Sequence, residues 1–118
     1  MLQLAHKKLE VCPIARELVK KIYLVTADFP KAEQYLIVTQ LPWAAVCICS
    51  NLAEGSSRIS KIEKKRFYEI ARASLVGIDT QIEIAVDLGY IKPEQVLTFE
   101  SKLESDFRML SKMIQKFS

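Results

Sequence analysis

Hydrophobic residues recur at helical spacing in four stretches of the chain. The intervals alternate between three and four residues, which places the apolar side chains on one face of a helix. The first stretch follows this spacing from Val11 to Val25, and the last follows it from Val96 to Phe117. The pattern predicts four helices, at about residues 11–27, 31–53, 60–88 and 93–117.

Three of these helices carry a single apolar stripe, and the second differs from them. The stripe residues are Val11, Ala15, Leu18, Ile22 and Val25 in the first helix, Phe67, Ala71, Ser74, Ile78, Ile82, Ala85 and Leu88 in the third, and Val96, Phe99, Leu103, Phe107, Leu110, Ile114 and Phe117 in the fourth. Long helices with short connections fold back on their neighbours. The sequence therefore predicts an all-α chain, a single antiparallel up-down-up-down four-helix bundle over residues 1–118.

Residues that favour the start or the end of a helix occur at the predicted helix boundaries. Pro30 restricts the residue before it, so the first helix ends there. Ser60 and Glu63 form a predicted capping box at the start of the third helix, in which hydroxyl and carboxylate each satisfy a backbone N–H. Gly89 suits the left-handed position after that helix, and Pro93 suits the first turn of the fourth.

The second helix is apolar on all sides between Leu41 and Cys49. A helix in an isolated bundle buries only one side, so we expect one face to meet the core and the other to meet a second subunit. Leu41, Trp43 and Ile48 are the predicted subunit interface, and simple core packing of these three residues is the alternative. Pro42 is expected to kink this helix. The run of residues 55–57, Gly-Ser-Ser, is expected to end it.

Composition narrows the function classes. Half the residues are hydrophobic, which excludes disorder, and a net charge of +3 is too small to indicate a nucleic-acid module by itself. The three cysteines form no C-x-x-C pair and His6 is the single histidine, so no metal site or disulfide framework is expected. No catalytic motif and no cofactor-binding motif is present, and we expect no enzyme, no catalytic residue and no cofactor. Neither a secretory signal nor a membrane-spanning run is evident, which favours a cytoplasmic location.

Charge is distributed unevenly along the third helix. Basic residues gather in its first half, whereas Asp79, Glu83 and Asp87 lie in its second half. This order opposes the helix macrodipole. The functional interpretation is a patch that binds RNA or DNA phosphates, whereas a solvated face is the favoured interpretation. The patch consists of Arg58, Lys61, Lys64, Lys65 and Arg66, with Tyr68 placed to stack on a base. The solvated face would carry local pairs such as Glu63 with Arg66 and a salt bridge to the next subunit.

A second polar group spans the end of the second helix and the third helix. Asn51 and Glu54 share a helix face, and an antiparallel third helix could return Arg72 toward them, with Arg58 nearby. Such a group would be either an Arg-carboxylate clamp for a ligand or partner, or a structural network that closes the corner between the two helices. The structural interpretation is favoured.

Several segments, in this order, resemble one bacterial family. They are Leu9-Glu10-Val11, Ala15-Arg16-Glu17-Leu18, Ile22-Tyr23, Phe29-Pro30, Ala44-Ala45-Val46, Ser50-Asn51-Leu52-Ala53-Glu54-Gly55, Ala71-Arg72-Ala73-Ser74-Leu75 and Leu88-Gly89-Tyr90-Ile91. The chain resembles the small four-helix-bundle proteins encoded by intervening sequences of bacterial large-subunit ribosomal RNA genes. It is also distantly similar to the accessory variability proteins of diversity-generating retroelements.

The resemblance implies a ring, a homopentamer, with no established enzymatic activity and a link to RNA or DNA. The chain departs from the family pattern at three places. Pro42-Trp43 replaces a basic pair, Cys49 replaces a proline, and Cys12 stands where the family commonly has a tryptophan. The first change removes two charges that a nucleic-acid role would have used.

The sequence thus predicts a homo-oligomeric interaction protein that contacts RNA or DNA through the basic start of the third helix. A scaffold or adaptor that binds only other proteins is the alternative. A small-molecule binder would need polar residues in the apolar stripes to orient its ligand, and the stripes contain no such set.

Overall fold

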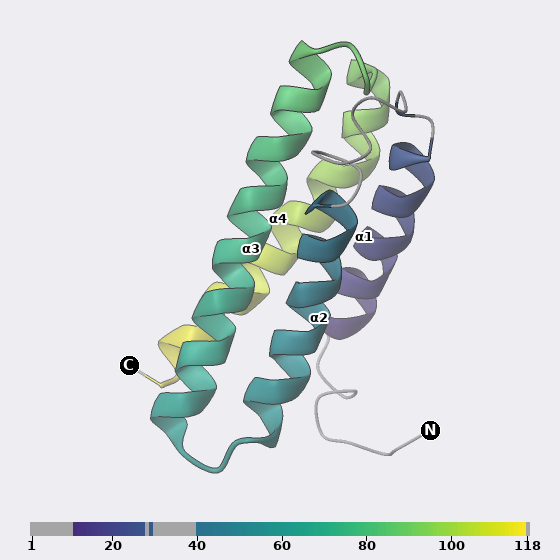
Figure 1. Ribbon diagram of the computed structural model, residues 1–118. Helices are drawn as coiled ribbons and strands as arrows, with labels where there is room; N and C mark the ends of the chain where they lie inside the picture. Colours follow the sequence, from purple (N-terminus) through teal and green to yellow (C-terminus); the bar gives the residue numbers. More distant parts are fainter. Residues whose placement is uncertain (1–10, 28, 30–39, 118) are drawn as a thin grey trace.

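The computed structural model describes residues 11–27, 29 and 40–117, and the structural statements below concern these residues. It contains the helices α1 (Val11–Thr26), α2 (Gln40–Ser57), α3 (Lys61–Asp87) and α4 (Pro93–Gln115). The helices run alternately up and down, as Figure 1 shows. The predicted all-α four-helix bundle is confirmed. The predicted beginning of the second helix, at residues 31–39, lies outside the described residues.

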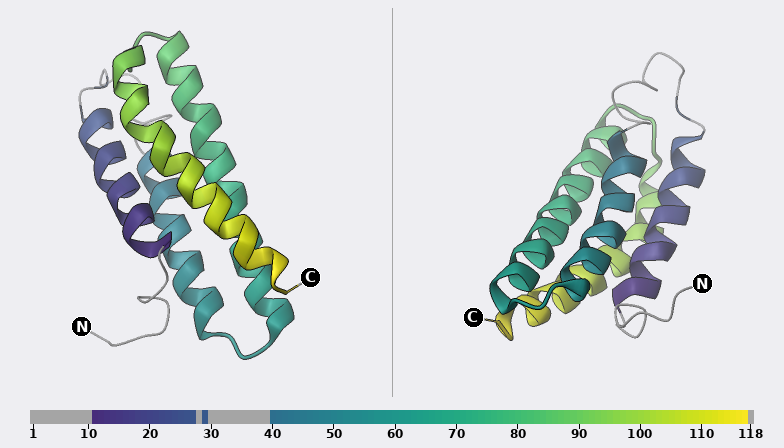
Figure 2. Two further views of the ribbon diagram at one scale, coloured as in Figure 1. Left: turned by 180° about the vertical axis from the view of Figure 1, so that it is seen from behind. Right: turned by 60° about the horizontal axis from the view of Figure 1, so that its bottom comes forward.

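The four helices close around a common core. Each helix packs against two others, α1 against α2 and α4, and α3 against α2 and α4. The longest, α3, has 27 residues and at about 1.5 Å per residue extends nearly the full 43 Å length of the bundle. Seen from behind, α4 crosses the bundle obliquely and ends near the start of α3 (Figure 2).

The core confirms most of the predicted stripe positions. In α1 the buried residues include Ala15, Leu18 and Ile22, as the spacing predicted. The full set of buried hydrophobic residues is Ala15, Leu18, Ile22, Phe29, Leu41, Ala45, Ile48, Leu52, Tyr68, Ala71, Leu75, Ile78, Ile82, Ala85, Ile91, Phe99, Leu103, Leu110 and Ile114. Residues of all four helices contribute to this core.

Two helices differ from the predicted stripes at single positions. In α3 the buried positions include Tyr68 and Leu75, whereas Leu88 is exposed. In α4 the predicted core residue Phe107 is 44% exposed, and its neighbour Asp106 is fully buried. Helical spacing permits either Asp106 or Phe107 to share a face with Leu103 and Leu110, because both are three or four residues from each of them. The prediction chose the hydrophobic residue, and that choice was wrong.

The end of α2 also differs from the prediction, because Gly55 does not break the helix. It lies within α2, which continues to Ser57, and it is buried where α2 meets α3. A Cβ atom at this position would lie 2.8 Å from Tyr68 Cε1 and 2.9 Å from Phe67 Cβ. The absence of a side chain therefore allows the two helices to approach closely.

The C-cap of α3 follows the sequence signal, and its N-cap follows it in part, because the contacts of the described residues include the Ser60 half of the predicted capping box but not the Glu63 half. Ser60 is the N-cap, and its hydroxyl accepts a hydrogen bond from the backbone N–H of Glu63. At the other end the N–H of Gly89 donates to Val86 O and the N–H of Tyr90 donates to Ala85 O, with Gly89 at a φ of 80°. This is the Schellman pattern, which requires a residue in the left-handed conformation.

The start of α4 is fixed within a few residues of this cap. Pro93 is its first residue, where the missing N–H has no cost. The side chain of Gln95 turns back and accepts a hydrogen bond of 2.9 Å from the backbone N–H of Lys92. The connection between α3 and α4 is thereby held to five residues.

Gly55→Ala should destabilise the protein. Because Phe67 Cβ is anchored to the backbone, the added methyl group would push α2 and α3 apart, at a net loss of about 1–2 kcal/mol in the free energy of unfolding. Urea denaturation measures this loss. Ser57→Ala, in the exposed last turn of the same helix, is the control and should change stability by less than about 0.5 kcal/mol. Equal stability of both variants would show that the helices are not held at this distance.

Candidate functional site

Basic side chains gather at one end of the hairpin formed by α3 and α4. Residues 58–75 contain six basic and two acidic residues, and residues 105–117 contain three basic and one acidic residue. The intervening residues 76–104, at the opposite end, contain six acidic and two basic residues. The ring of Tyr68 lies 6.0 Å from that of Phe117, and Arg72 donates to Ser111 Oγ, so both basic segments lie at the same end. The hairpin is therefore electrically polarised along its length.

Three predicted patch residues keep their charge available to solvent. Lys61 and Arg66 are exposed and Lys65 is half-buried. The ion pairs found in the described part of the chain join Glu17 to Lys20 and Glu54 to Arg58, so Lys61, Lys65 and Arg66 have no carboxylate partner there. The local pair of Glu63 with Arg66, weighed as an alternative, is not formed. These cations can bind an external anion without first breaking an ion pair.

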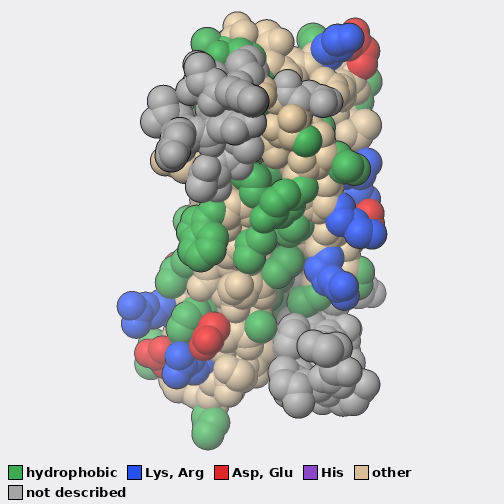
Figure 3. Space-filling model, turned by 45° about the vertical axis from the view of Figure 1, so that its right-hand side comes forward, with side chains coloured by type: hydrophobic (Ala, Val, Ile, Leu, Met, Phe, Trp, Pro, Cys, Tyr) green, Lys and Arg blue, Asp and Glu red, His purple; other side chains and the backbone are tan. Residues whose placement is uncertain are grey.

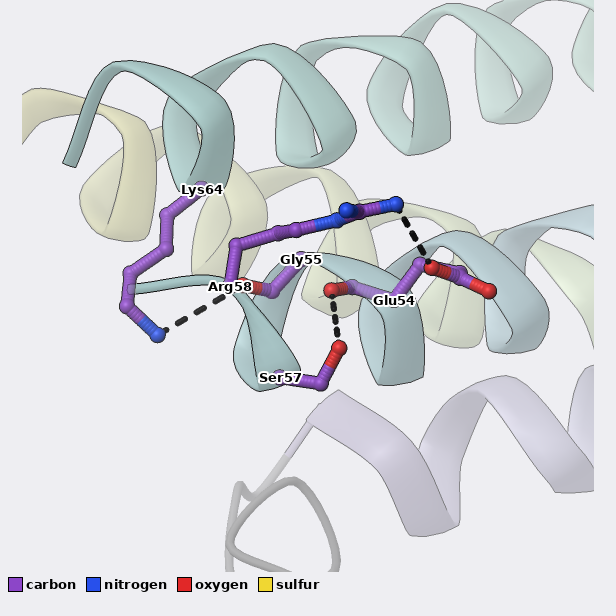
Figure 4. A network of polar contacts seen from close by, with 5 residues as sticks. All are labelled: Glu54, Gly55, Ser57, Arg58 and Lys64. Carbon is purple, nitrogen blue, oxygen red and sulfur yellow. Dashed lines mark hydrogen bonds and ion pairs between the residues drawn. The ribbon is translucent and has the colours of Figure 1, made fainter. Parts of the chain in front are cut away.

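Arg58 and Lys64 have structural partners at the end of α2, as Figure 4 shows. Arg58 donates to Glu54 at 3.2 Å, and its guanidinium lies 5.0 Å from the centre of the Phe67 ring. The ammonium of Lys64 donates to Ser56 O at 3.0 Å and to Gly55 O at 3.5 Å. A cation that binds the last carbonyls of a helix stabilises its negative end. Lys64 therefore caps α2, and of the predicted patch residues it is less available to an external anion than Lys61, Lys65 and Arg66.

Tyr68 cannot stack on a base, because its side chain is buried between α2 and α4. Its hydroxyl and that of Ser56 form a hydrogen bond of 2.9 Å, and its ring packs against Phe117. The prediction of a stacking residue is wrong. Position 68 lies on the core-facing side of α3, one residue from Phe67, which the stripe had placed there instead.

The predicted polar network does not assemble. Asn51 donates to Cys47 O in its own helix, and Glu54 pairs with Arg58. Arg72 points to α4, where it donates to Ser111 Oγ at 3.2 Å and lies 5.8 Å from the centre of the Phe107 ring. The network of Asn51, Glu54 and Arg72 is therefore wrong. The side of α3 that carries Arg72 faces α4 and not the end of α2.

An apolar groove lies beside the basic end. It runs between the outer side of α3 and the end of α4, and Lys65 and Arg66 stand at its edge. Its lining residues are Ile62, Lys65, Arg66, Glu69, Ile70, Ala73 and Phe117. A second groove at the other end of the hairpin has acidic edges from Asp79, Glu83, Asp87 and Glu100. Each end of the hairpin thus combines apolar surface with an excess of one sign of charge.

The outer face of α2 carries no charged residue from Gln40 to Ala53. Trp43 is 68% exposed on this face, and Val46 and Cys47 are half-buried. Figure 3 shows hydrophobic side chains gathered in the middle of the face formed by α1 and α2. An uncharged, exposed helix face of this kind is typical of a surface that binds another protein.

Leu41 and Ile48 do not belong to this outer face. Both are fully buried in the core of the same chain, together with Ala45 and Leu52. Their prediction as subunit-interface residues is therefore wrong, and Trp43 alone remains from that set. Pro42 lies in the first turn of α2, where its missing N–H is harmless. The carbonyl that a kink would free, at residue 38, lies outside the described residues.

Asp106 was not singled out by the sequence, yet it is the most unusual polar residue of the core. Its side chain is 0% exposed, and neither carboxylate oxygen has a hydrogen-bond partner in the described part of the chain. Burial raises its pKa to about 7, although Lys102 acts in the opposite direction. Below about pH 7 the neutral, protonated form is favoured, because an ionised carboxylate is costly to bury.

Two cysteines lie in the electrostatic neighbourhood of Asp106. Burial raises the pKa of the Cys49 thiol to about 11, with Cys12 and Asp106 adding to the effect, and burial raises the pKa of Cys12 as well. Arg16 acts in the opposite direction on both thiols. Neither cysteine is in a disulfide. Thiols with raised pKa values are poor nucleophiles, and these two behave as small apolar groups.

The described residues contain no group of His, Cys, Asp and Glu side chains placed to hold a metal ion. Among the helices whose positions are described, none has the length and apolar character required to cross a bilayer.

The bundle, its polarised hairpin and its uncharged α2 face define a small four-helix-bundle protein. Comparison with family models identifies a match to the 23S rRNA-intervening sequence protein family over residues 7–114. The chain belongs to this family, as the resemblance of its helix segments predicted. A comparison with curated proteins finds no significant match.

The buried carboxyl group of Asp106 should make stability depend on pH. Its pKa of about 7 in the folded state exceeds its ordinary value of 3.8, so the unfolded chain loses this proton first. The free energy of unfolding should fall by about 3 to 4 kcal/mol as pH rises from about 4 to 7, and this contribution should be constant above pH 7. Urea denaturation of the protein and of Asp106→Asn at pH 4.5 and pH 8 measures it. The variant should lack this fall, and an identical pH dependence in both proteins would contradict the assignment.

Proposed function

We propose that this protein is a non-enzymatic, self-associating adaptor that binds the phosphate backbone of RNA or DNA through the basic end of α3 and α4. The observation that carries the proposal is the presence of Lys61, Lys65 and Arg66 on one end of the molecule without a carboxylate partner among the described residues. Lys112 and Lys116 are exposed at the same end. Clustered cations gain affinity for nucleic acid by releasing counterions from the phosphates.

The mode of binding follows from the types of residue at this end. Long cationic side chains contact phosphates, which position a protein without specifying sequence. Tyr68 is buried, and Phe67 is covered by the guanidinium of Arg58, so neither ring is available to stack on a base. The proposed contact therefore has little sequence preference and is sensitive to salt.

Self-association is supported by the outer face of α2. Trp43 on an uncharged helix face combines a large apolar side chain with a polar indole N–H, a combination that is enriched in binding hot spots. We propose that this face contacts a second copy, in a ring of about five copies as the family resemblance implies. A parallel ring would bring the basic ends of all copies to one rim and so multiply their contacts with one nucleic-acid strand.

The alternative function, a scaffold that binds only other proteins, is favoured by the same α2 face. It would use Trp43 for a client protein and leave the basic end solvated. Pull-down from a lysate before and after nuclease treatment separates the two functions. A partner that is lost after nuclease treatment was bridged by nucleic acid, whereas a partner that survives supports the protein-only function.

Reversing two cations of the basic end should abolish most nucleic-acid affinity. Lys61→Glu/Lys65→Glu should weaken binding of single-stranded RNA and of duplex DNA and reduce the slope of log affinity against log salt by about 2. Filter binding between about 50 and 200 mM salt measures both. The matched control is Lys20→Glu/Lys21→Glu on α1, which changes net charge equally and should retain the slope. Equal losses in both variants, or no salt-dependent affinity in the parent protein, would reject the nucleic-acid contact.

Trp43→Glu should reduce the mass of the assembly. A carboxylate in an apolar contact is costly to desolvate, so the variant should form a smaller species in light scattering at both low and high salt. Leu97→Glu on α4 is the control, because Leu97 is 67% exposed, almost the same as Trp43. This control should retain the parent's mass. If Trp43→Glu retains both the mass and the melting temperature of the parent, the interface lies elsewhere.

A further inference from the structure

The helix α3 has a second line of small and apolar residues on the side that faces away from the core. Figures 1 and 2 show α3 at an edge of the bundle, with no other described helix over that side. The line repeats at intervals of three and four residues, as a contact between two helices requires. Its members are Ile70, Ala73, Gly77, Thr80 and Ile84, which we call the outer seam. The two isoleucines are 40% and 46% exposed.

The outer seam has the same order of residue types from either end. Gly77 stands at its centre, with a small residue and then an isoleucine on each side. The same spacing continues by one step to Arg66 at one end and to Asp87 at the other, and both are exposed. Between these two charges the seam contains no charged residue. A surface with this symmetry complements itself when a second copy runs in the opposite direction.

Gly77 has no evident role within the chain. Glycine in the middle of a helix is destabilising relative to alanine. A Cβ atom at position 77 would meet nothing within 4 Å, in contrast to Gly55, where the neighbouring helix allows no side chain. The fold therefore does not require glycine at position 77. A glycine at the centre of an exposed seam permits the backbone of another helix to approach closely.

We propose that the outer seam of α3 is a two-fold interface, on which a second copy of this protein places its own α3 in antiparallel orientation. This inference rests on the self-association proposed above and adds a second contact surface, distinct from the face of Trp43. With the symmetry axis near Gly77, the seam isoleucine at position 70 of each copy lies level with the one at position 84 of the other. The apolar side chains exposed on the isolated chain become covered.

Charge complementarity identifies the occupant as a second copy in antiparallel orientation. In that orientation Arg66 of each copy lies level with Asp87 of the other, so within the pair the phosphate contacts fall to Lys61, Lys65, Lys112 and Lys116. More broadly, the basic half of each hairpin lies over the acidic half of its partner. Two carboxylates of α3, Glu63 and Glu69, lie in the basic half and reduce the attraction, and Glu69 lies near Glu83 of the other copy. A parallel orientation would place Arg66 against Arg66 and Asp87 against Asp87, which is repulsive.

Exchanging the two end charges tests the orientation. Arg66→Asp and Asp87→Arg each place like charges together twice in the two-fold pair, and each variant alone should associate about tenfold more weakly than the parent. An equal mixture of the two variants should regain the parent's affinity, because each supplies the charge that the other lacks. So should the double variant Arg66→Asp/Asp87→Arg. Sedimentation equilibrium of the full chain over a range of concentrations measures these affinities without any nucleic acid present.

Gly77→Leu tests the close approach independently of charge. The leucine has open space within its own chain, so circular dichroism and the melting curve should show a folded protein, and the limiting mass should fall to half that of the parent. A parent multimer whose mass is unchanged by Gly77→Leu and by Arg66→Asp would overturn the outer-seam interface but leave self-association through Trp43 standing. A parent that is monomeric at every concentration would overturn both. If Gly77→Leu does not fold, the charge exchange alone decides.

Discussion

The close contact of α2 with α3 is the constraint on which the rest of the molecule depends. Gly55 has no side chain, Tyr68 fills the space against it, and Lys64 binds the free carbonyls of the same helix end. Together these contacts fix the direction in which α3 leaves the turn after Ser57. That direction places the start of α3 beside the end of α4, so cations from two distant segments share one end of the bundle.

The main outline of this fold could be predicted from the sequence, because helical periodicity, the Ser60 cap, Gly89 and Pro93 act locally. The rotation of each helix about its own axis was harder to predict. Every residue of α2 from Leu41 to Cys49 is apolar, so no polar side marks the outer face in this part, and Leu41 could not be separated from Trp43. In α4, the positions of Asp106 and Phe107 fit the same helical spacing, and hydrophobicity favoured the wrong one.

The prediction of the candidate site was limited by the same unknown, the rotation of each helix about its own axis. Lys61, Lys65 and Arg66 were recognised because a basic run at a helix start opposes the macrodipole, which is a property of sequence order. Which of the neighbouring side chains are engaged elsewhere depends on contacts between helices. Lys64 and Arg72 both belong to the basic run, yet one caps α2 and the other binds α4. Periodicity within one helix contains no information about either contact.

The segregation of charge along the hairpin of α3 and α4 has a consequence before any contact is made. Opposite net charges at the two ends give the molecule a permanent electric moment parallel to the helix axes. Near a polyanion, within about the 8–10 Å over which salt permits such fields to act, this moment exerts a torque on the whole bundle. A single copy would therefore approach a polyanion end on, with its basic end toward the strand and its acidic end held away from it.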